Sequence, residues 1–476
     1  MKKPIIVVSI LLVVSLVGVG TYSKYIRGIF PILLSPSVPI EDQIGDSPGP
    51  GGNNTDFPLK LPPNFSVSIF AKNLPGVRVM AFDQFGNMWV SQTSEGMVSL
   101  LEVEDGKVAR QNPVLKNLAR PHGLVFDPQF PSILYIAEED KIFRLPTYSD
   151  GGSETVVALP EGRRHFTRTI KFGPDDRLYV SIGSSCDVCI EVNDRFAKIF
   201  SMKRDGSDMK EFARGLRNTV FFDWSYVDGR MWGTEMGRDW LGDDAPPDEI
   251  NILEEGKNYG WPICYGKNNH DTSFDKNTYI RNPCMAPFET PSYIDIPAHS
   301  APLGLAFIPE EGWPEEYWYD LLIAYHGSWN RSDPTGYTVV RAKLDAQGNF
   351  SGFEDFITGW LQGSEALGRP VDIIARPGGV LYISDDKAGV IYKVAYKNDE
   401  IIQPPLSREE WPCIKTGCSG QICSDDDIIT TCEFREEYAC YKTAVCERGQ
   451  DGKCGWRDTK ELSMCLKSAK GEARIP

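Results

Sequence analysis

Apolar residues in the central part of the chain occur in short runs of the length of a β-strand. Each run is followed by a turn rich in Asp, Gly or Pro and then by a second apolar run, which is the pattern of a β-hairpin. Six segments share this pattern: VMAFDQFGNMWVSQ from Val79, GLVFDPQFPSILYIAE from Gly123, TIKFGPDDRLYVSIG from Thr169, VFFDWSYVDGRMWGTE from Val220, GLAFIPEEGWPEEYWYDLLIAYHG from Gly304 and VDIIARPGGVLYISDD from Val371.

The six hairpins predict a repeat protein. Most are followed by a third apolar strand, such as KIFRLPTY from Lys141 or VIYKVAYK from Val390. Repeats of roughly 40–50 residues with several strands each are typical of a β-propeller. We therefore predict an all-β fold with a six-bladed β-propeller over residues 59–400, in which FSVSIFAKNL, from Phe65, completes the last blade as its outer strand. A β-sandwich or two separate β domains is the alternative, and six copies of one hairpin argue against it.

The N-terminus has the pattern of a targeting segment. Lys2 and Lys3 precede an apolar run, and no further charge occurs before Lys24. This pattern indicates a signal peptide or signal anchor over residues 1–25. The run is about 20 residues long, roughly the length that spans a bilayer, and no clear A-x-A site follows. We expect an exported protein that is anchored on the outer face of the cytoplasmic membrane, or periplasmic or extracellular if the segment is cleaved.

Residues 26–58 are expected to be a linker, since positions 42–58 are rich in Gly, Pro, Asn and Asp. The chain has 476 residues, a formal net charge of −16 and a sequence pI of about 4.9. Nucleic acid is therefore a poor partner, because phosphate binding needs a cationic surface.

Twelve cysteines are present, and they predict disulfides because the chain is expected to be exported. In the propeller we pair Cys186 with Cys189 and Cys264 with Cys284. A redox-active reading of CDVC would need a thioredoxin-like βαβ context, which is absent.

The other eight cysteines predict a small disulfide-rich domain over residues 401–476, which resembles the bacterial eight-cysteine-cluster domain. Eight cysteines allow 105 connectivities, and the sequence does not choose among them. A zinc site is the rival interpretation, but no His follows His326. The eight are Cys413, Cys418, Cys423, Cys432, Cys440, Cys446, Cys454 and Cys465.

Candidate chemistry is concentrated just before the first strands of the repeats. The five histidines form no HxH or HExxH spacing, and no G-x-S-x-G motif is present, so a zinc hydrolase or serine hydrolase is not indicated. Loops at one end of a propeller surround its central channel, so several blades can direct side chains into one volume. A base beside several cations in this register predicts an anionic ligand. The residues are Arg120 and His122 before the second repeat, His165 before the third, Arg217 and Asn218 before the fourth, and Arg369 before the sixth.

These motifs carry a family resemblance. HFTRTIKFGPDDRLYVSIG, GLRN, EMGRDW, DEINILEEGKNYGWP, HGSWNR and GRPVDI occur in this order along residues 59–400. The combination resembles the soluble pyrroloquinoline quinone (PQQ) sugar dehydrogenases, and most closely the sorbosone and aldose sugar dehydrogenase branch.

The resemblance implies roles for the matching positions. His165 corresponds to the general base, Arg217 and Asn218 to residues that contact PQQ, and Arg369 to an arginine that binds a PQQ carboxylate. Gly237 and Arg238 correspond to the pair whose backbone carbonyls hold Ca²⁺. The HGSWNR motif adds Trp329 and Arg331 as candidate cofactor-binding residues.

The sequence departs from the family at four positions. Thr219 and Arg238 stand where relatives have Pro, and Val371 stands where the glucose enzymes have a second Arg. Their lysine has no clear match, and Arg331 is the candidate substitute. These changes bear on cofactor affinity and substrate choice more than on the class of reaction.

The expected function is an exported quinoprotein dehydrogenase that oxidises a sugar, aldose or sorbosone-like, with PQQ and Ca²⁺. Electrons would pass to a membrane quinone or another acceptor. The alternatives are a propeller lactonase, which should direct acidic metal ligands into the channel, and a non-catalytic binding scaffold displayed on the surface.

Overall fold

The computed structural model describes residues 52–148, 151–162, 164–397, 413–417, 420–424, 437–449 and 453–469. The chain divides into two compact units, with the division after Lys397. The predicted targeting segment, the linker up to residue 51, and the cysteines at 418 and 432 lie outside the described residues. Within the described ranges, no helix has the length and apolar character needed to span a bilayer.

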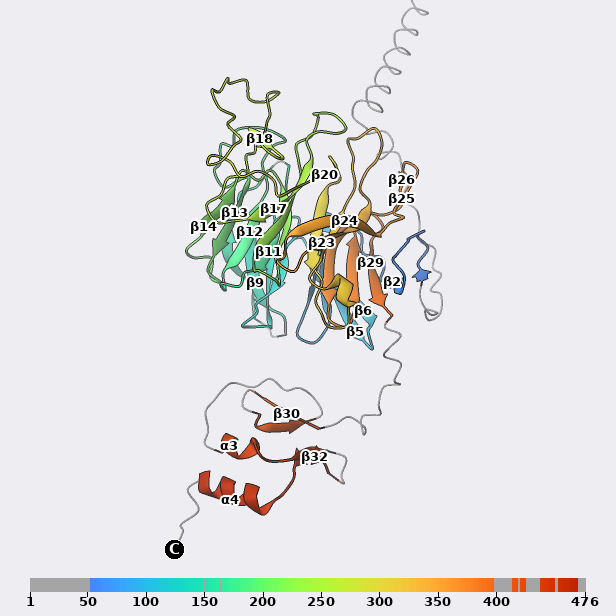
Figure 1. Cartoon of the computed structure of the whole chain (residues 1–476), viewed down its shortest axis with the longest axis vertical. Helices are drawn as coiled ribbons and strands as arrows, with labels where there is room; N and C mark the ends of the chain where they lie inside the picture. The colour runs from blue at the N-terminus through green and yellow to red at the C-terminus, as the bar shows by residue number, and fades with distance from the viewer. Residues whose placement is uncertain are drawn as a thin grey trace, which may run out of the picture. The chain divides into compact units, whose positions relative to one another are not determined.

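The first unit is a six-bladed β-propeller, as the repeats predict. Each blade is an antiparallel sheet in which the first strand of the repeat is innermost. In Figure 1 the third blade and the fifth and sixth blades lie on opposite sides of this unit. The first three blades are β3 (Val77–Phe82), β4 (Met88–Gln92), β5 (Met97–Glu104) and β6 (Lys107–Leu115); β7 (Leu124–Phe126), β8 (Ile133–Ala137), β9 (Lys141–Pro146) and β10 (Glu154–Ala158); and β11 (Ile170–Phe172), β12 (Leu178–Ile182), β13 (Lys198–Met202) and β14 (Lys210–Arg214).

The later blades carry longer connections. They are β15 (Thr219–Trp224), β16 (Met231–Glu235), β17 (Asp248–Leu253) and β20 (Ile294–Ile296); β21 (Pro302–Phe307), β22 (Leu321–Tyr325), β23 (Thr338–Leu344) and β24 (Phe350–Ile357); and β27 (Pro370–Arg376), β28 (Val380–Asp385), β29 (Val390–Tyr396) and β2 (Phe65–Ala71). Short elements in the connections are β18 (Cys264–Tyr265), β19 (Asn269–His270), β25 (Leu361–Gln362), β26 (Glu365–Ala366) and the 3₁₀ turns η2 (Thr93–Glu95) and η3 (Glu315–Tyr317).

The ring closes through the N-terminal strand of the propeller. β2 pairs antiparallel with β29, with Phe65 opposite Tyr396, so it is the fourth strand of the last blade. The prediction for this segment is confirmed. β1 (Gly52–Asn54) adds a parallel strand outside β2.

Neighbouring blades are joined by apolar packing and by buried hydroxyls. In the third, fourth and sixth blades the second strand carries a Ser or Thr whose hydroxyl donates to a carbonyl in the innermost strand of the next blade. A buried hydroxyl needs such a partner, so each bond fixes the spacing of two blades near the channel. These bonds run from Ser181 to Thr219, from Thr234 to Leu303 and from Ser384 to Arg78.

The second unit is small and held by disulfides. Its elements are β30 (Ile414–Thr416), β31 (Ile422–Ser424), α3 (Tyr438–Tyr441), β32 (Cys446–Arg448), β33 (Cys454–Trp456) and α4 (Lys460–Ala469). Among the described residues of this unit, three disulfides join Cys413 to Cys454, Cys423 to Cys446 and Cys440 to Cys465. Among its described apolar side chains only Cys440 and Leu462 are buried, so cross-links take the place of a core.

Candidate active site

A cavity of about 240 Å³ lies where three neighbouring blades direct their loops toward the channel. The segments that precede β11, β15 and β21 line it, together with those that follow β16 and β22. Several sequence-predicted residues meet here although they are far apart in the chain. The lining residues are Arg164, His165, Arg217, Asn218, Met236, Gly237, Asp239, Asp248, His299, Ala301, Trp329 and Asn330.

The imidazole of His165 is held in one tautomer by Ser184. Nδ1 lies 2.9 Å from the carbonyl oxygen of Ser184 and 2.9 Å from its hydroxyl oxygen. That hydroxyl donates its only hydrogen to the Cys186 carbonyl, at 2.6 Å, so both Ser184 oxygens accept from Nδ1–H. The lone pair is therefore on Nε2, which has no hydrogen-bonding partner among the described residues.

His165 is neutral at physiological pH. Burial lowers the pKa of its imidazole well below the usual value, and the nearby cations of Arg217, Arg164 and Arg168 lower it further. The Ser184 contact acts in the opposite direction but does not outweigh burial. A neutral ring with a free Nε2 can accept a proton.

Gly183 allows His165 and Asn218 to approach each other. A Cβ at this position would lie 2.6 Å from Cβ of His165 and 2.7 Å from Oδ1 of Asn218. No side chain fits in that space, so glycine at the end of β12 is a requirement of the site.

Asn218 presents an unsatisfied acceptor to the cavity wall. Its backbone amide donates to Glu235, at 2.7 Å, and its Nδ2 donates to the sulfur of Met236, at 3.3 Å. Oδ1 is buried and has no hydrogen-bonding partner among the described residues. Leaving a buried acceptor unpaired is costly, so this oxygen is suited to receive a donor from a ligand.

The guanidinium of Arg217 is fixed on several sides. Nε donates to the Asp187 carbonyl at 2.9 Å, and one terminal nitrogen lies 2.8 Å from the Asp187 carboxylate and 3.3 Å from that of Asp239. The other terminal nitrogen donates to the Met236 carbonyl at 3.3 Å. Its side chain is only 5% exposed, so the cation is held in a set orientation at the cavity.

The turn after β16 presents oxygen donors. The amide of Gly237 donates to Asp248 at 2.8 Å, while the carbonyls of Gly237 and Arg238 accept no hydrogen bond from the described residues. The Arg238 side chain is paired with Asp271, at 2.8 Å. Free carbonyl oxygens are hard donors of the kind that Ca²⁺ prefers.

Three cationic residues predicted from sequence lie outside the cavity lining. Arg369 donates to the carbonyls of His326 and Gly327, on the loop that also carries Trp329. Arg331 instead binds the acidic loop, with contacts to the Asp243 carbonyl and to the Asp244 carboxylate at 2.8 Å. Arg120 is exposed and pairs with Glu139 at 3.4 Å. The structure therefore does not bring Arg369, Arg331 or Arg120 into the cavity lining.

A buried cluster contains His122, a candidate from the sequence, together with Asp386, Arg78 and His326, which were not predicted. Asp386 pairs with Arg78 at 2.5 Å and with His326 at 2.9 Å, while Nε of Arg78 and Nε2 of His122 are buried without partners among the described residues. Arg78 lies in β3 at the position equivalent to Val371 in β27, since Val77 and Pro370 begin the two innermost strands in the same register. The register of the other candidate residues therefore did not point to Arg78.

Two aromatic rings flank the cavity. Trp329, which lines it, meets Trp240 edge to face, with 5.2 Å between ring centroids, and Trp240 is 36% exposed. Both cysteine pairs predicted in the propeller are disulfide-bonded, Cys186 to Cys189 and Cys264 to Cys284.

Comparisons with known proteins agree with the motif resemblance. A family model described as TrAA12-like matches residues 59–397. A chain from Borreliella burgdorferi is 32% identical over 359 residues, which cover 71% of this chain and 91% of that one. The PQQ-dependent pyranose dehydrogenase of Coprinopsis cinerea is 22% identical over 423 residues, covering 75% of this chain and 57% of the enzyme. The predicted resemblance to PQQ sugar dehydrogenases is confirmed.

Solved structures show the same fold. The holo PQQ domain of the Coprinopsis cinerea pyranose dehydrogenase has a TM-score of 0.62 at 20% identity, over 72% of this chain and 98% of that domain. The PQQ-bound aldose sugar dehydrogenase of Streptomyces coelicolor has a TM-score of 0.52 at 20% identity, over 71% of this chain and 99% of the other.

Proposed function

We propose that this chain, which belongs to the TrAA12-like family, is an exported PQQ- and Ca²⁺-dependent dehydrogenase that oxidises a sugar, aldose or sorbosone-like. The relatives named as PQQ-dependent pyranose dehydrogenase and aldose sugar dehydrogenase support the class of reaction.

One observation carries the proposal: a neutral imidazole with a free Nε2 lines the same cavity as a fixed guanidinium. His165 supplies the proton acceptor and Arg217 the cation. A reaction that removes a proton from a hydroxyl while an anionic cofactor is bound needs both groups.

The donor set fits PQQ. The cofactor carries three carboxylates, which charge-assisted bonds from arginine suit. PQQ also carries a pyrrole N–H group. This donor could bind Oδ1 of Asn218, an acceptor that has no hydrogen-bonding partner among the described residues. Arg217 and Asn218 would hold the cofactor at the cavity. Arg369, which precedes β27 and donates to the carbonyls of His326 and Gly327, would bind a cofactor carboxylate.

The carbonyls of Gly237 and Arg238 would hold Ca²⁺, because they are oxygen acceptors without a hydrogen-bonding partner among the described residues. When bound, PQQ supplies the acceptor for two electrons, and Ca²⁺ supplies a Lewis acid.

The chain's own residues then orient the sugar and take its proton. Nε2 of His165 accepts the hydroxyl proton, while Nδ1 keeps its bond to Ser184. The Trp240 and Trp329 rings provide an apolar face beside the polar wall, which suits a molecule with both C–H and O–H groups. Arg164 and Asn330 fix the position of the Asp239 carboxylate on the cavity wall.

Export is supported by the N-terminal pattern and by the disulfides of both units, since disulfides persist in oxidising compartments. The electron acceptor would be a membrane quinone or a redox protein.

A lactonase is disfavoured by the state of the two carboxylates that line the cavity. Asp248 accepts the amides of Gly237 and Ala301, at 2.8 and 2.7 Å. Asp239 accepts from Arg164, Arg217 and Asn330. Neither carboxylate is left free to act as an acidic metal ligand of the kind that a lactonase needs.

The test is reconstitution of the purified protein with PQQ and Ca²⁺, followed by dye-linked oxidation of a panel of aldoses and sorbosone. Turnover should require both additions, and His165→Ala should abolish turnover while PQQ still binds. His270→Ala, in the β18–β19 hairpin, is the matched control and should retain turnover. Turnover of His165→Ala at the unmodified rate would refute the role of His165. Failure of the unmodified protein to oxidise any sugar, or hydrolysis of lactones instead, would refute the dehydrogenase.

A further inference from the structure

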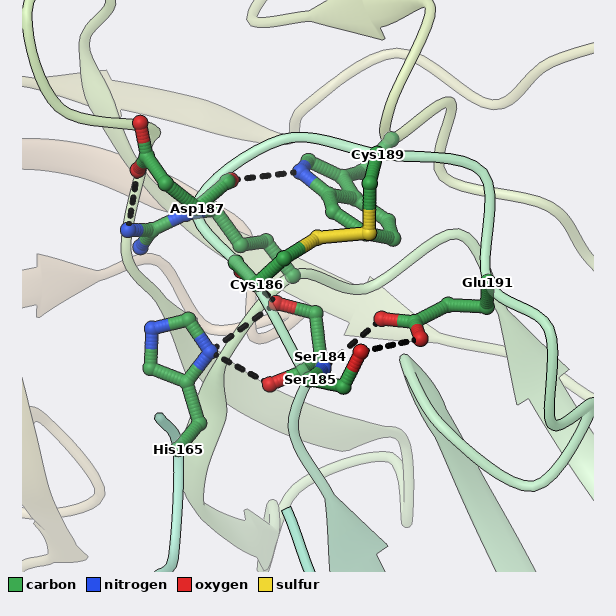
Figure 2. The surroundings of a disulfide bond; sticks show 9 residues. His165, Ser184, Ser185, Cys186, Asp187, Cys189 and Glu191 are labelled. Carbon is green, nitrogen blue, oxygen red and sulfur yellow. Dashed lines mark hydrogen bonds and ion pairs between the residues drawn. A yellow bond between two sulfur atoms is a disulfide. The ribbon is translucent and has the colours of Figure 1, made fainter. Parts of the chain in front are cut away.

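The loop between β12 and β13 is closed by the Cys186–Cys189 disulfide, and Figure 2 shows that this small ring lies beside His165. Only two residues separate the cysteines. A disulfide stabilises the whole fold more when it closes a longer loop, so this one contributes little to global stability. Its effect is local.

The disulfide ring acts on His165, the proposed proton acceptor, through the Cys186 carbonyl. The Cys186 carbonyl takes the only hydrogen of the Ser184 hydroxyl, at 2.6 Å. That bond turns the Ser184 oxygen into an acceptor for Nδ1 of His165. If the carbonyl moved, the hydroxyl could donate to Nδ1 and the lone pair on Nε2 would be lost.

The disulfide ring also fixes the guanidinium of Arg217, through Asp187. Asp187, inside the ring, binds Arg217 through both its carbonyl and its carboxylate, at 2.9 and 2.8 Å. The same carboxylate accepts the backbone amide of Asp239 at 2.9 Å, and the carbonyl also accepts Nε1 of Trp261 at 3.3 Å. One residue of the loop therefore fixes the guanidinium and the turn that follows Gly237 and Arg238.

A second brace holds the base of the loop. Glu191 accepts the amide of Ser185 at 2.7 Å and its hydroxyl at 2.6 Å. A carboxylate oxygen of Glu191 and both sulfurs lie within 4.8 Å of one another. A negative charge there disfavours attack by an anionic thiolate, so it protects the disulfide.

We propose that the Cys186–Cys189 disulfide is a positioning device of the active site, which holds Ser184 and Asp187 so that His165 keeps its tautomer and Arg217 its orientation. The proposal rests on the proposed function, since it assigns these two residues to the support of its base and its cation. Neither Ser184 nor Asp187 lines the cavity, so both act through other residues.

The test compares Cys186→Ala/Cys189→Ala with Cys264→Ala/Cys284→Ala in the full chain. The control disulfide spans 20 residues and is buried, so its loss should lower the melting temperature more. The first double variant should instead raise the Kd for PQQ about tenfold, by calorimetry with Ca²⁺, and lower kcat more than it changes KM.

A readout without cofactor separates this inference from the proposed function. In the apoprotein, hydrogen exchange at the Asp239 amide should speed up about tenfold in the first double variant and stay unchanged in the control, because that amide donates to Asp187. Asp187→Ala should reproduce the faster exchange. Asp187→Asn, which keeps an acceptor oxygen, should restore most of the protection.

Unchanged exchange and unchanged Kd in Cys186→Ala/Cys189→Ala would overturn the positioning role. So would an equal loss of cofactor affinity in both double variants, which would mean a general loss of stability. If the unmodified protein binds no PQQ, the proposed function fails, and the exchange data still decide whether the disulfide orders the loop.

Discussion

The carboxylate of Asp372, in the innermost strand of the sixth blade, accepts the backbone amide of Met80, in the innermost strand of the first blade, at 2.9 Å. This bond crosses the seam at which the ring closes. Asp372 is only 6% exposed, and its other oxygen accepts the amide of Ile373. The Asp372 side chain therefore joins the sixth blade to the first, as the Ser384–Arg78 bond also does.

Asp372 should make stability depend on pH. Burial raises its pKa to about 7, whereas an unfolded Asp titrates near ~3.9. Between these values the folded state holds a proton that the unfolded state has lost, so stability contributed by this group falls as pH rises from about 4 to about 7. Relative to Asp372→Asn, the wild type should lose up to about 4 kcal/mol over that range, measured by urea unfolding.

The difference between wild type and variant cancels the contribution of other buried groups. Glu316→Gln, at an exposed carboxylate, is the control and should show no such trend. The raised pKa would be contradicted if the free energy of unfolding of the wild type increased relative to that of Asp372→Asn as pH rises.

His165 should stay neutral well below the pH at which an ordinary histidine titrates. Its pKa is lowered by burial and by Arg217, Arg164 and Arg168. A lowered pKa means that protonation occurs only at lower pH, so its imidazole signals should not move between pH 8 and 6.5. The measurement is NMR of ¹³C-histidine-labelled apoprotein, with His165→Gln to assign the signal. A midpoint at or above 6.5 would disprove the prediction.

Gly183→Ala should damage the site. The new methyl group would lie 2.6 Å from His165 and 2.7 Å from Asn218, so one of the two must move. We expect kcat/KM of the reconstituted enzyme to fall at least about tenfold. We expect a loss of about 1–3 kcal/mol in stability as well. Gly152→Ala is the matched control, because a Cβ there has no atom within 4 Å. Equal activity of the two variants would contradict the predicted steric conflict with His165 and Asn218.

Arg369→Ala should weaken PQQ binding by about 1.5–3 kcal/mol, roughly ten- to a hundredfold in Kd, because a charge-assisted bond to a carboxylate is lost. Arg331→Ala should change Kd much less, since Asp243 and Asp244 hold that guanidinium. Calorimetry of the apoprotein measures both. If Arg331→Ala raised the Kd for PQQ more than Arg369→Ala did, Arg331 would again be the candidate substitute for the lysine of the family.

Removal of the second unit should leave the propeller intact. The last blade is complete at Tyr396, and the two units are separately compact. A chain truncated after Pro404 should keep its melting temperature within a few degrees and should retain sugar oxidation after reconstitution. Loss of either would show that the cysteine-rich unit supports the propeller.

The fold could be predicted largely from the sequence, because a propeller blade is a local unit. Each hairpin contains its own turn, so the pattern from Thr169 to Gly183 already predicts β11 and β12. Closure by β2 could also be predicted, since an apolar strand before the first repeat has only the last blade to complete. The register of His165, Arg217, Asn218 and Arg369 before their strands followed from the same repeat.

Only the tertiary structure decided which of these side chains share a cavity and in what state. Arg331 and Arg217 both follow motif positions, yet Asp244 draws the first to an outer loop while Asp187 fixes the second at the cavity. The tautomer of His165 depends on Ser184 and Cys186, which are 19 and 21 positions away. Repeats specify backbone direction through short-range patterns, whereas charge pairing and hydrogen-bond direction arise from atoms that approach only when the ring has closed.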